Sequence, residues 1–356
     1  MKIEKKEIAN KLGKLKVLLN SKIIGNDGVV VKGNTLYATN IEMSIKTTLD
    51  IPASDENFVI PKSSIGLIEN LPEGIIDITC KDKSVFIKCG KIKNKFPKYD
   101  LKNYPQRSDI KTKENTVINS EKLFGAINSV LYAVSETSDR KEVLKGVLLE
   151  AKDGILNVVG CDGFRMAWSK IECDGEFKLI IPKDIMRKII SIGMTGDIKI
   201  TCDKSGVKFN NDEYEIYSRV ITGEYLGYRQ LFIDYPNQTF IERKNLSECL
   251  KRTLICGDDK SNNTIRCKFD KENVSVSLYQ SISEYEEIVG LEKSVKESLE
   301  IGFNGRYLLD TINSFGSDKV SIGLGNNNQA IIMNDEKNSA LLLPIRLREK
   351  EKSAAA

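Results

Sequence analysis

The chain has 356 residues, of which 40% are hydrophobic and 29% are charged, as is ordinary for a soluble globular protein. Lys and Arg (54) barely outnumber Asp and Glu (50), and the resulting net charge of +4 is too small to indicate nucleic-acid binding by itself. The chain has no histidine, which excludes a Ser-His-Asp triad, histidine metal ligands and imidazole acid–base catalysis.

Other absences narrow the class of protein further. No stretch approaches 18 consecutive apolar residues, so we expect no membrane span. The sequence starts with an amphipathic helical pattern rather than an apolar signal core, which favours a cytoplasmic protein. The eight cysteines form no Cys-x-x-Cys pair, and we interpret them as reduced, mostly buried thiols. Without zinc spacings, glycine-rich phosphate loops or an EF-hand loop, the sequence predicts no metal and no cofactor.

The first predicted domain covers residues 1–115. Its first helix has apolar residues three to four apart on one face, surrounded by lysines, a pattern that most often indicates a solvated helix. A short apolar strand, a proline and a helical turn follow at 58–68, and a hairpin follows at 76–88. The polar segment 91–114 contains two prolines, and we expect a connector with little regular structure there.

The second predicted domain covers residues 116–237. A strand is expected at 143–149, and the dipeptide Asp162-Gly163 predicts a hairpin turn. Residues 223–235 form an aromatic-rich connector to the next domain.

The third predicted domain covers residues 238–347. It ends in an apolar strand that Pro344 restricts to a sheet edge or terminates, because proline cannot donate a ladder hydrogen bond. Residues 348–356 form a charged tail, whose final three alanines we interpret as an expression scar and leave out of the fold.

One pattern recurs in all three domains: a short apolar strand, a proline or asparagine, and an amphipathic helix. It occurs at 58–68, 179–190 and 301–310, about every 120 residues, which is the length of a whole domain and too long for a solenoid repeat. Each domain follows the order helix, strands, helix, strands. We therefore predict an α+β protein made of three tandem copies of one domain.

Six segments of the chain stand out together: residues 40–43, 71–74, 162–167, 228–229, 303–310 and 343–347. In this order they resemble the bacterial sliding-clamp family, the beta subunits of DNA polymerase III. The resemblance runs from residue 1 to 347, and the ordered set with its threefold repeat is more specific than any single segment. It implies three tandem clamp-fold domains, each with two helices packed on antiparallel sheets, and a six-domain ring formed by a homodimer.

The resemblance also implies a function. Members of the family are non-catalytic processivity factors of the replicative polymerase, and their rings encircle double-stranded DNA with the helices facing the hole. Basic side chains on those helices attract phosphates without reading sequence, and weakly enough to permit sliding. The candidate DNA-facing residues are Lys11, Lys14, Lys183, Arg187, Lys188, Lys251 and Arg252.

A second implied site is a peptide-binding pocket between domains 2 and 3. Replicative and repair DNA polymerases, the clamp loader and mismatch-repair proteins insert a short apolar motif there. Carried over by motif, the wall residues of domain 2 are Leu144, Cys161, Gly163, Phe164, Arg165 and Met166. Those of the connector are Leu226, Gln230 and Leu231. Those of domain 3 are Ile265, Asn304, Tyr307, Ala330, Leu341, Leu342, Leu343, Pro344, Ile345 and Arg346.

The sequence departs from the family at three of these positions. Phe164 stands where a histidine is usual, Leu226 where a proline is usual, and Gln230 where an arginine is frequent. These changes predict a more apolar pocket with a shifted motif preference. Without the resemblance, the wall residues would be interpreted as ordinary inter-domain core.

The implied subunit interface joins domain 1 to domain 3 of a second copy through strand edges and a small apolar cluster. The candidate members of this cluster are Phe96, Leu254 and Ile255. Such an interface is expected to bury more than about 1,000 Å².

Two alternatives stay open from the sequence. One is a clamp-fold adaptor that binds protein motifs but does not encircle DNA, which the three departures at the pocket keep open. The other is an enzyme with an unrecognised site. The absence of histidine, nucleotide loops and metal spacings counts against the enzyme.

Overall fold

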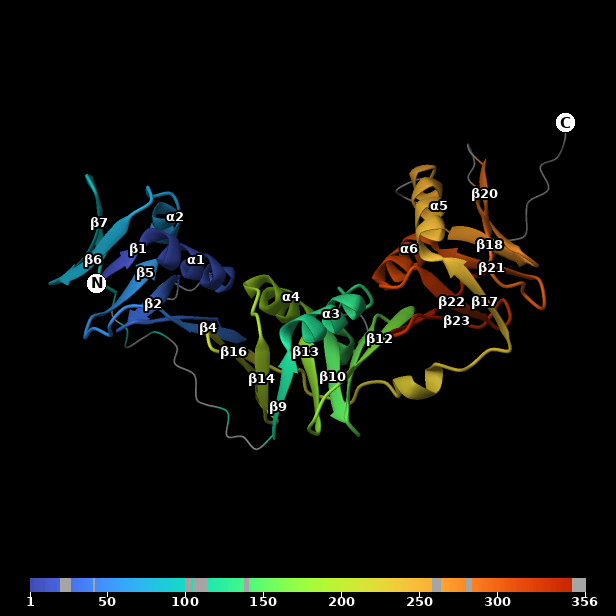
Figure 1. Cartoon of the computed structure of the whole chain (residues 1–356), viewed down its shortest axis with the longest axis horizontal. Helices are drawn as coiled ribbons and strands as arrows, with labels where there is room; N and C mark the ends of the chain where they lie inside the picture. The colour runs from blue at the N-terminus through green and yellow to red at the C-terminus, as the bar shows by residue number, and fades with distance from the viewer. Residues whose placement is uncertain are drawn as a thin grey trace. The chain divides into compact units, whose positions relative to one another are not determined.

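The computed structural model describes residues 1–19, 27–40, 42–99, 101, 104, 110, 114–137, 141–257, 264–279 and 284–347 (Figure 1). The predicted tail at 348–356 lies outside the described residues. Within the described chain one order of elements occurs three times: a strand, a helix, four strands, a helix and three strands. This confirms the α+β class and the threefold repeat.

Each repeat contains eight strands and two longer helices in the same chain order. The first repeat contains β1 (Lys2–Glu4), α1 (Lys5–Leu15), β2 (Gly28–Lys32), β3 (Thr35–Thr39), β4 (Met43–Thr48), β5 (Asn57–Pro61), α2 (Lys62–Glu69), β6 (Ile75–Lys81), β7 (Ser84–Cys89) and β8 (Ile92–Pro97). The second contains β9 (Glu114–Asn119), α3 (Ser120–Leu131), β10 (Gly146–Lys152), β11 (Ile155–Cys161), β12 (Arg165–Glu172), β13 (Phe177–Pro182), α4 (Lys183–Ile192), β14 (Asp197–Cys202), β15 (Gly206–Asn210) and β16 (Tyr214–Arg219). The third contains β17 (Asn237–Glu242), α5 (Arg243–Ile255), β18 (Thr264–Asp270), β19 (Asn273–Tyr279), β20 (Glu284–Gly290), β21 (Leu299–Asn304), α6 (Gly305–Ser314), β22 (Lys319–Leu324), β23 (Ile331–Asn334) and β24 (Asn338–Leu342).

Two expectations about local structure are wrong. Residues 142–145 form a 3₁₀ turn before β10, so Leu144 is not in a strand. The segment 91–114, expected to be a connector, contains β8, which pairs with β7. Four of the six residues of β8 are exposed. An edge strand of this kind lacks the apolar alternation that identifies a half-buried strand in a sequence.

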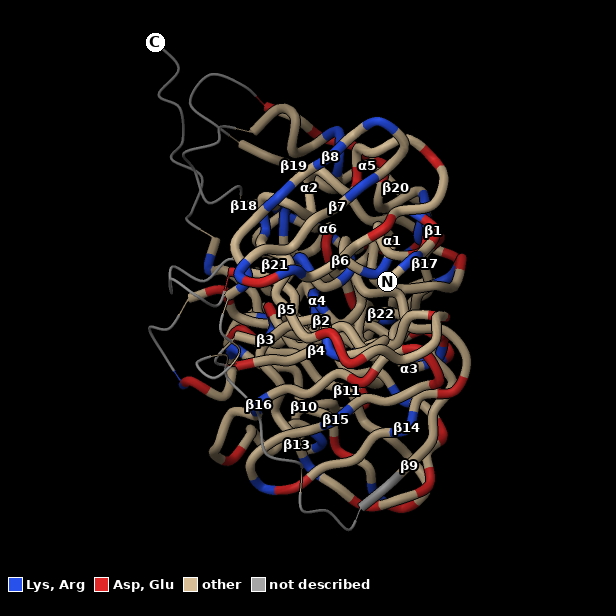
Figure 2. Tube along the Cα trace, turned by 90° about the vertical axis from the view of Figure 1, so that its left-hand side faces the viewer, with Lys and Arg blue, Asp and Glu red and all other residues tan. Residues whose placement is uncertain are grey.

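Contacts divide the chain into two compact units. The first comprises Met1–Phe124 and Cys173–Ile221. Its larger sheet has the strand order β5-β2-β3-β4-β16-β15-β14-β9, and a smaller sheet has the order β1-β6-β7-β8. Helix α1 buries Ile8, Leu12 and Leu15 on one face, as its spacing predicts, and packs against α2. The hairpin of β7 and β8 is basic, with Lys88 on β7, Lys91 in the turn, and Lys93 and Lys95 on β8 (Figure 2).

The second compact unit comprises Gly125–Glu172 and the described residues from Thr222 onward. Its larger sheet runs β10-β11-β12-β24-β23-β22-β17, and its smaller sheet has the order β20-β19-β18-β21. Helices α5 and α6 pack together over a core that includes Phe303 and Ile312. Strands β12 and β24 join the second and third repeats in one sheet, as β4 and β16 join the first and second. Because neighbouring repeats share a sheet, the sheets do not separate the three predicted domains. The domain boundaries at residues 115 and 237 therefore stay a prediction.

No helix among the described residues is both long and apolar enough to cross a membrane. All eight cysteines are free thiols, and six of them are buried, as the sequence predicts.

Candidate functional site

The tight turn between β11 and β12 carries several of the predicted wall residues. Gly163 has a φ of 89°, a conformation that a residue with a Cβ adopts only under strain. One carboxylate oxygen of Asp162 accepts the backbone N–H groups of Phe164 and Arg165 at 2.8 and 2.9 Å. The turn is thereby fixed, and the Phe164 side chain is left 46% exposed.

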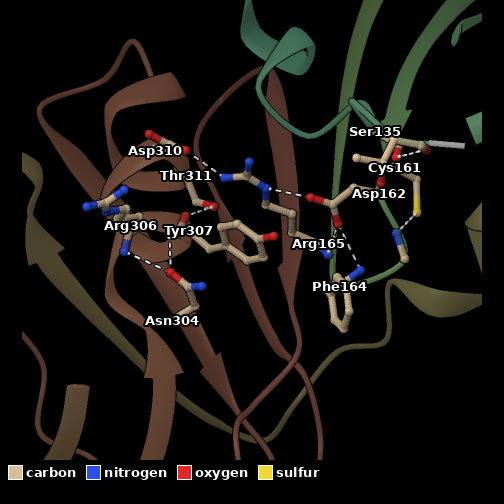
Figure 3. Close-up of polar contacts among 12 residues, drawn as sticks. Ser135, Cys161, Asp162, Phe164, Arg165, Asn304, Arg306, Tyr307, Asp310 and Thr311 are labelled. Atoms are coloured by element: carbon tan, nitrogen blue, oxygen red, sulfur yellow. Dashed lines mark hydrogen bonds and ion pairs between the residues drawn. The ribbon is translucent and has the colours of Figure 1, made fainter. Parts of the chain in front are cut away.

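Arg165 connects this turn to helix α6 (Figure 3). Its guanidinium makes ion pairs with Asp162 at 3.0 Å and with Asp310 at 2.8 Å. It also lies over the rings of Tyr307, 4.0 Å from the centroid, and Tyr132, 5.1 Å from the centroid. Burial lowers the pKa of Arg165, but the hydrogen bond to Asp310 and the charge of Asp162 outweigh burial, and the net shift is upward. Arg165 therefore holds two elements together and stays charged.

Sequence reasoning missed Asp310 and Tyr132 as partners of Arg165. Asp310 lies 145 positions further along the chain, and no spacing rule pairs the two residues. The only sequence signal at Asp310 is its place in the recurring strand–helix pattern at 301–310.

Exposed Phe164 and Leu343 and half-buried Tyr307 form a small apolar cluster, which we call the Phe164 patch. The rings of Phe164 and Tyr307 lie 6.3 Å apart between centroids, and the backbone N–H of Leu343 donates to the Phe164 carbonyl at 2.9 Å. Leu343 is 41% exposed. Asn304 caps helix α6 by accepting the N–H groups of Arg306 and Tyr307, which fixes the start of the helix that carries the Tyr307 ring (Figure 3).

Cys161, Met166 and Leu341 lie in one row across the larger sheet of the second compact unit. Cys161 pairs with Met166 and Met166 pairs with Leu341, so their side chains share one face, which we call the connector face. All three are buried, as is Leu144. They can therefore form only the floor of a site.

Two predicted wall residues belong to the core instead. Ile265 is fully buried and pairs opposite Phe303 in the smaller sheet, within the core of the third repeat. Leu342 is 1% exposed and belongs to the same core. Side chains alternate along a strand, so Leu342 faces away from the connector face that Leu341 shares. Neither side chain is exposed in the described structure, and the expectation that these two residues line the pocket stays a prediction.

The connector (residues 223–235) covers part of the connector face. Trp168 of β12 packs against Tyr228 and Phe232 of the connector, with ring centroids 5.1 and 5.3 Å apart. Leu231 and Gln230 are exposed and Leu226 is half-buried.

The remaining wall residues follow the end of the connector and of β24. The hydroxyl of Tyr235 donates to the Ala330 carbonyl at 2.9 Å. After β24 ends, before Pro344, the N–H of Ile345 donates to Gly302 at 2.7 Å, and Arg346 is exposed. Most of the predicted wall thus gathers in the second compact unit as a buried floor and an exposed rim.

The predicted DNA-facing residues lie on α1, α4 and α5. Lys251 is exposed, and the amine of Lys14 donates to the Ser191 carbonyl at 3.4 Å. Lys11 donates to the Thr48 carbonyl. Lys183 does not fit the predicted DNA-facing set, because the residue is only 5% exposed and its charge does not face solvent.

Two of the candidate arginines have acidic partners. Arg187 lies 3.6 Å from Asp184, whereas Lys188 on the same helix is half-buried. Arg252 pairs with both carboxylate oxygens of Glu287, and its hydrogen bonds lower the pKa of Glu287 to about 2. Arg252 therefore offers less unpaired charge than Lys251.

The predicted interface residues differ in exposure. Ile255 is 82% exposed at the end of α5, and Leu254 is half-buried. Phe96 is 6% exposed and packs beside Val85 within its own sheet. Its membership of the interface cluster stays a prediction. Among the described residues, no group of three or more Cys, Asp or Glu side chains is arranged to hold a metal ion.

The family profile described as DNA polymerase III beta subunit, central domain, matches residues 117–226, and the C-terminal domain of the same subunit matches residues 233–346. Together these ranges cover more than half of the chain. The chain belongs to the DNA polymerase III beta subunit family. The resemblance drawn from the sequence is thus confirmed.

Beta sliding clamps of other bacteria are similar in sequence to most of this chain. The chain is 23% identical to the beta sliding clamp of Helicobacter pylori, across 98% of this chain and 95% of that protein. It is 22% identical to the beta sliding clamp of Pseudomonas aeruginosa, across 91% and 92%. The solved beta subunit of Streptococcus pyogenes superposes with a TM-score of 0.92 at 18% identity, covering 97% of this chain and 99% of that one. At this identity the structural likeness establishes the fold.

Proposed function

We propose that the chain is a DNA sliding clamp, a non-catalytic ring that encircles duplex DNA and tethers DNA polymerases to it. The observation that carries the proposal is the threefold repeat of one clamp-type domain in a chain of this family. A tether of this kind needs topology and surface charge, and it needs no acid–base group, nucleotide loop or metal. The alternative of an adaptor that does not encircle DNA has no observation in its favour.

The DNA-facing surface is proposed to consist of exposed and half-buried basic residues on the repeated helices. Lys11, Lys14, Arg187, Lys188, Lys251 and Arg252 remain candidates. Contacts from such residues to phosphates are independent of sequence and typically give dissociation constants of about 10⁻⁴–10⁻⁶ M at physiological salt. That strength suits a protein that must move along DNA while ring closure prevents its escape.

Ring closure is proposed to occur between β8 of one copy and β20 of a second. Two edges are already paired within the chain, β4 with β16 and β12 with β24. By position in the repeat, β8 corresponds to β16 and β24, and β20 corresponds to β4 and β12. In the strand orders, β8 and β20 are the strands of this type at sheet edges. A head-to-tail homodimer would pair them in the same way.

The charges on these two edges favour that pairing. Alternation along β8 places Lys93 and Lys95 on the face away from buried Phe96. Alternation along β20 places exposed Glu284 and Glu286 on the corresponding face, because Glu287 turns toward α5 to meet Arg252. A basic edge would therefore meet an acidic edge.

The peptide site is proposed to centre on the Phe164 patch and the connector. Its exposed aromatic and aliphatic side chains suit the leucine and phenylalanine anchors of a short apolar motif. Replicative and repair polymerases, the clamp loader and mismatch-repair proteins are the partners proposed to carry such motifs. We also propose that the protein works in the cytoplasm, where free thiols such as its eight cysteines stay reduced.

The first test is the solution mass of the chain by light scattering across a dilution series. Twice the 39.9 kDa chain mass, persisting on dilution, is expected for a closed ring. The dimer should then stay on circular plasmid after loading and leave the same plasmid once it is linearised. A monomer at all concentrations, or equal retention on both plasmids, would contradict the proposal and favour the adaptor.

A further inference from the structure

The connector is held on the connector face at two consecutive residues by one carboxylate. The hydroxyl of Tyr228 donates to an oxygen of Glu150 at 2.7 Å, and Arg229 makes an ion pair with the same oxygen at 2.7 Å. Glu150 lies on β10 and is 9% exposed. Burial and the hydrogen bond to Glu150 raise the pKa of Tyr228, so its hydroxyl stays protonated and remains a donor.

We call Glu150 with its two partners, Tyr228 and Arg229, the anchor. Hydrogen bonds and ring contacts connect this anchor to neighbouring strands of the sheet. The side-chain amide of Asn157 donates to the backbone carbonyl of Glu150 at 3.1 Å, and its carbonyl accepts the indole N–H of Trp168 at 3.0 Å. Trp168 then packs against Tyr228 and Phe232. Because Glu150 pairs with Asn157 across adjacent strands, these side chains share the connector face.

The anchor lies between two of the predicted wall residues. The N–H of Tyr228 donates to the carbonyl of Leu226 at 2.8 Å, and Leu231 follows Arg229 by two positions. Glu150 itself is buried under the connector, so it is placed to hold these residues rather than to contact a peptide. Removing Glu150 would leave the hydroxyl of buried Tyr228 without its acceptor, which costs more than the loss of an exposed contact, whereas water can solvate the half-exposed Arg229 side chain.

We propose that Glu150 is the positioning residue of the peptide site: it fixes the connector so that Leu226 and Leu231 form a rigid wall beside the Phe164 patch. This inference rests on the proposed peptide site and adds a residue that the family resemblance did not supply. A wall that is already fixed gives up little conformational freedom when a peptide binds, whereas a loose connector must be ordered by the peptide at a cost in affinity.

The chain provides its own reporter, because Trp168 is its only tryptophan and lies within the anchor. Fluorescence of Trp168 and binding of a labelled peptide with a Leu-Phe anchor are measured on the full chain, together with its thermal unfolding. The variants are Glu150→Ala, Glu150→Gln and Tyr228→Phe. The control is Glu300→Gln, which removes the same charge from a carboxylate paired with Arg266 at 2.6 Å.

Glu150→Ala is expected to shift Trp168 emission to the red and to weaken peptide binding at least tenfold. Glu150→Gln retains an oxygen that can accept from Tyr228 and should recover part of both effects, and Tyr228→Phe should show a smaller loss. Glu300→Gln should match the unmodified chain. Unchanged emission and affinity in a folded Glu150→Ala variant would overturn the proposal. If the unmodified chain binds no peptide, the peptide site is wrong, and the emission of Glu150→Ala alone decides whether Glu150 anchors the connector.

Discussion

Single residues decide which parts of the predicted peptide site can contact a ligand. Leu342 and Leu343 are neighbours with opposite roles, since Leu342 is 1% exposed in the core and Leu343 is 41% exposed in the Phe164 patch. Tyr307 belongs to the same patch and also supports Arg165 from one face. A mutation can therefore test the site only if it alters the exposed side chain rather than the core beneath it.

Tyr307→Ala and Leu343→Ala are each expected to weaken peptide binding. For Tyr307→Ala we expect at least a tenfold loss, about 1.4 kcal/mol, because an aromatic anchor surface is removed. Fluorescence anisotropy with a labelled peptide measures the affinity. Leu342→Ala provides the contrast: it should cost about 2–5 kcal/mol of stability by leaving a cavity in the core. Full affinity in both patch variants would show that the site lies elsewhere.

At the residue scale, motif order predicted that Phe164, Tyr307 and Leu343 lie close together, and they do. That they bind a peptide stays a prediction. Motif order could not show that Arg165 is already held by two carboxylates, because Asp310 is remote in sequence. It also could not separate Leu341 from Leu342, or show that Lys183 is buried, since both depend on how far each strand or helix is rotated.

At the scale of elements, helix α3 depends on a close approach to β11. A Cβ added to Gly160 of β11 would lie 2.4 Å from the Val130 carbonyl of α3 and 2.9 Å from the Val134 side chain. Gly125, within α3 itself, has open space at its Cβ position. Close packing therefore requires a glycine at position 160, whereas no steric contact requires one at position 125.

Gly160→Ala and Gly125→Ala should change stability in opposite directions. Gly160→Ala should destabilise by about 1–3 kcal/mol, because a backbone carbonyl must move to make room. Gly125→Ala should stabilise by up to about 1 kcal/mol, because alanine has the higher helix propensity. Chemical denaturation measures both free energies of unfolding. An equal change for the two variants would indicate that α3 does not pack on β11 as described.

Sequence patterns identified most elements, and the exceptions have physical causes. Helices with one apolar face, such as α1 and α5, were predictable because a packed helix must bury one stripe. Strand β8 was missed because it is rich in lysine and mostly exposed, and a strand with an unpaired edge has little apolar alternation to detect. That same property makes β8 a candidate for pairing with another copy.

Neighbouring repeats are joined in the same way twice, by the strand pairs β4–β16 and β12–β24. The corresponding strands β8 and β20 are left at sheet edges. Within the chain, β4 pairs with β16 and places Lys46 opposite Glu215, an opposite-charge pair across the junction. The open edges have the reverse polarity, with lysines on β8 and glutamates on β20. Opposite charges across strands stabilise pairing and like charges oppose it, so we expect these edges to discriminate between correct and incorrect partners.

Reversing one charge on each edge should reveal this pairing. Lys95→Glu or Glu286→Lys alone should weaken the dimer several-fold, because like charges would then face each other across the strands. The double variant should recover most of the affinity, and high salt should reduce all of these differences because it screens exposed charges. Light scattering over a dilution series measures the dissociation constant. Lys81→Glu is the matched control, because exposed Lys81 lies on β6, where it pairs with Ser84 of β7, so a whole strand separates it from β8. If Lys81→Glu weakens the dimer as much as Lys95→Glu, or if the double variant is no better than either single variant, β8 does not pair with β20 and the ring must close through another surface.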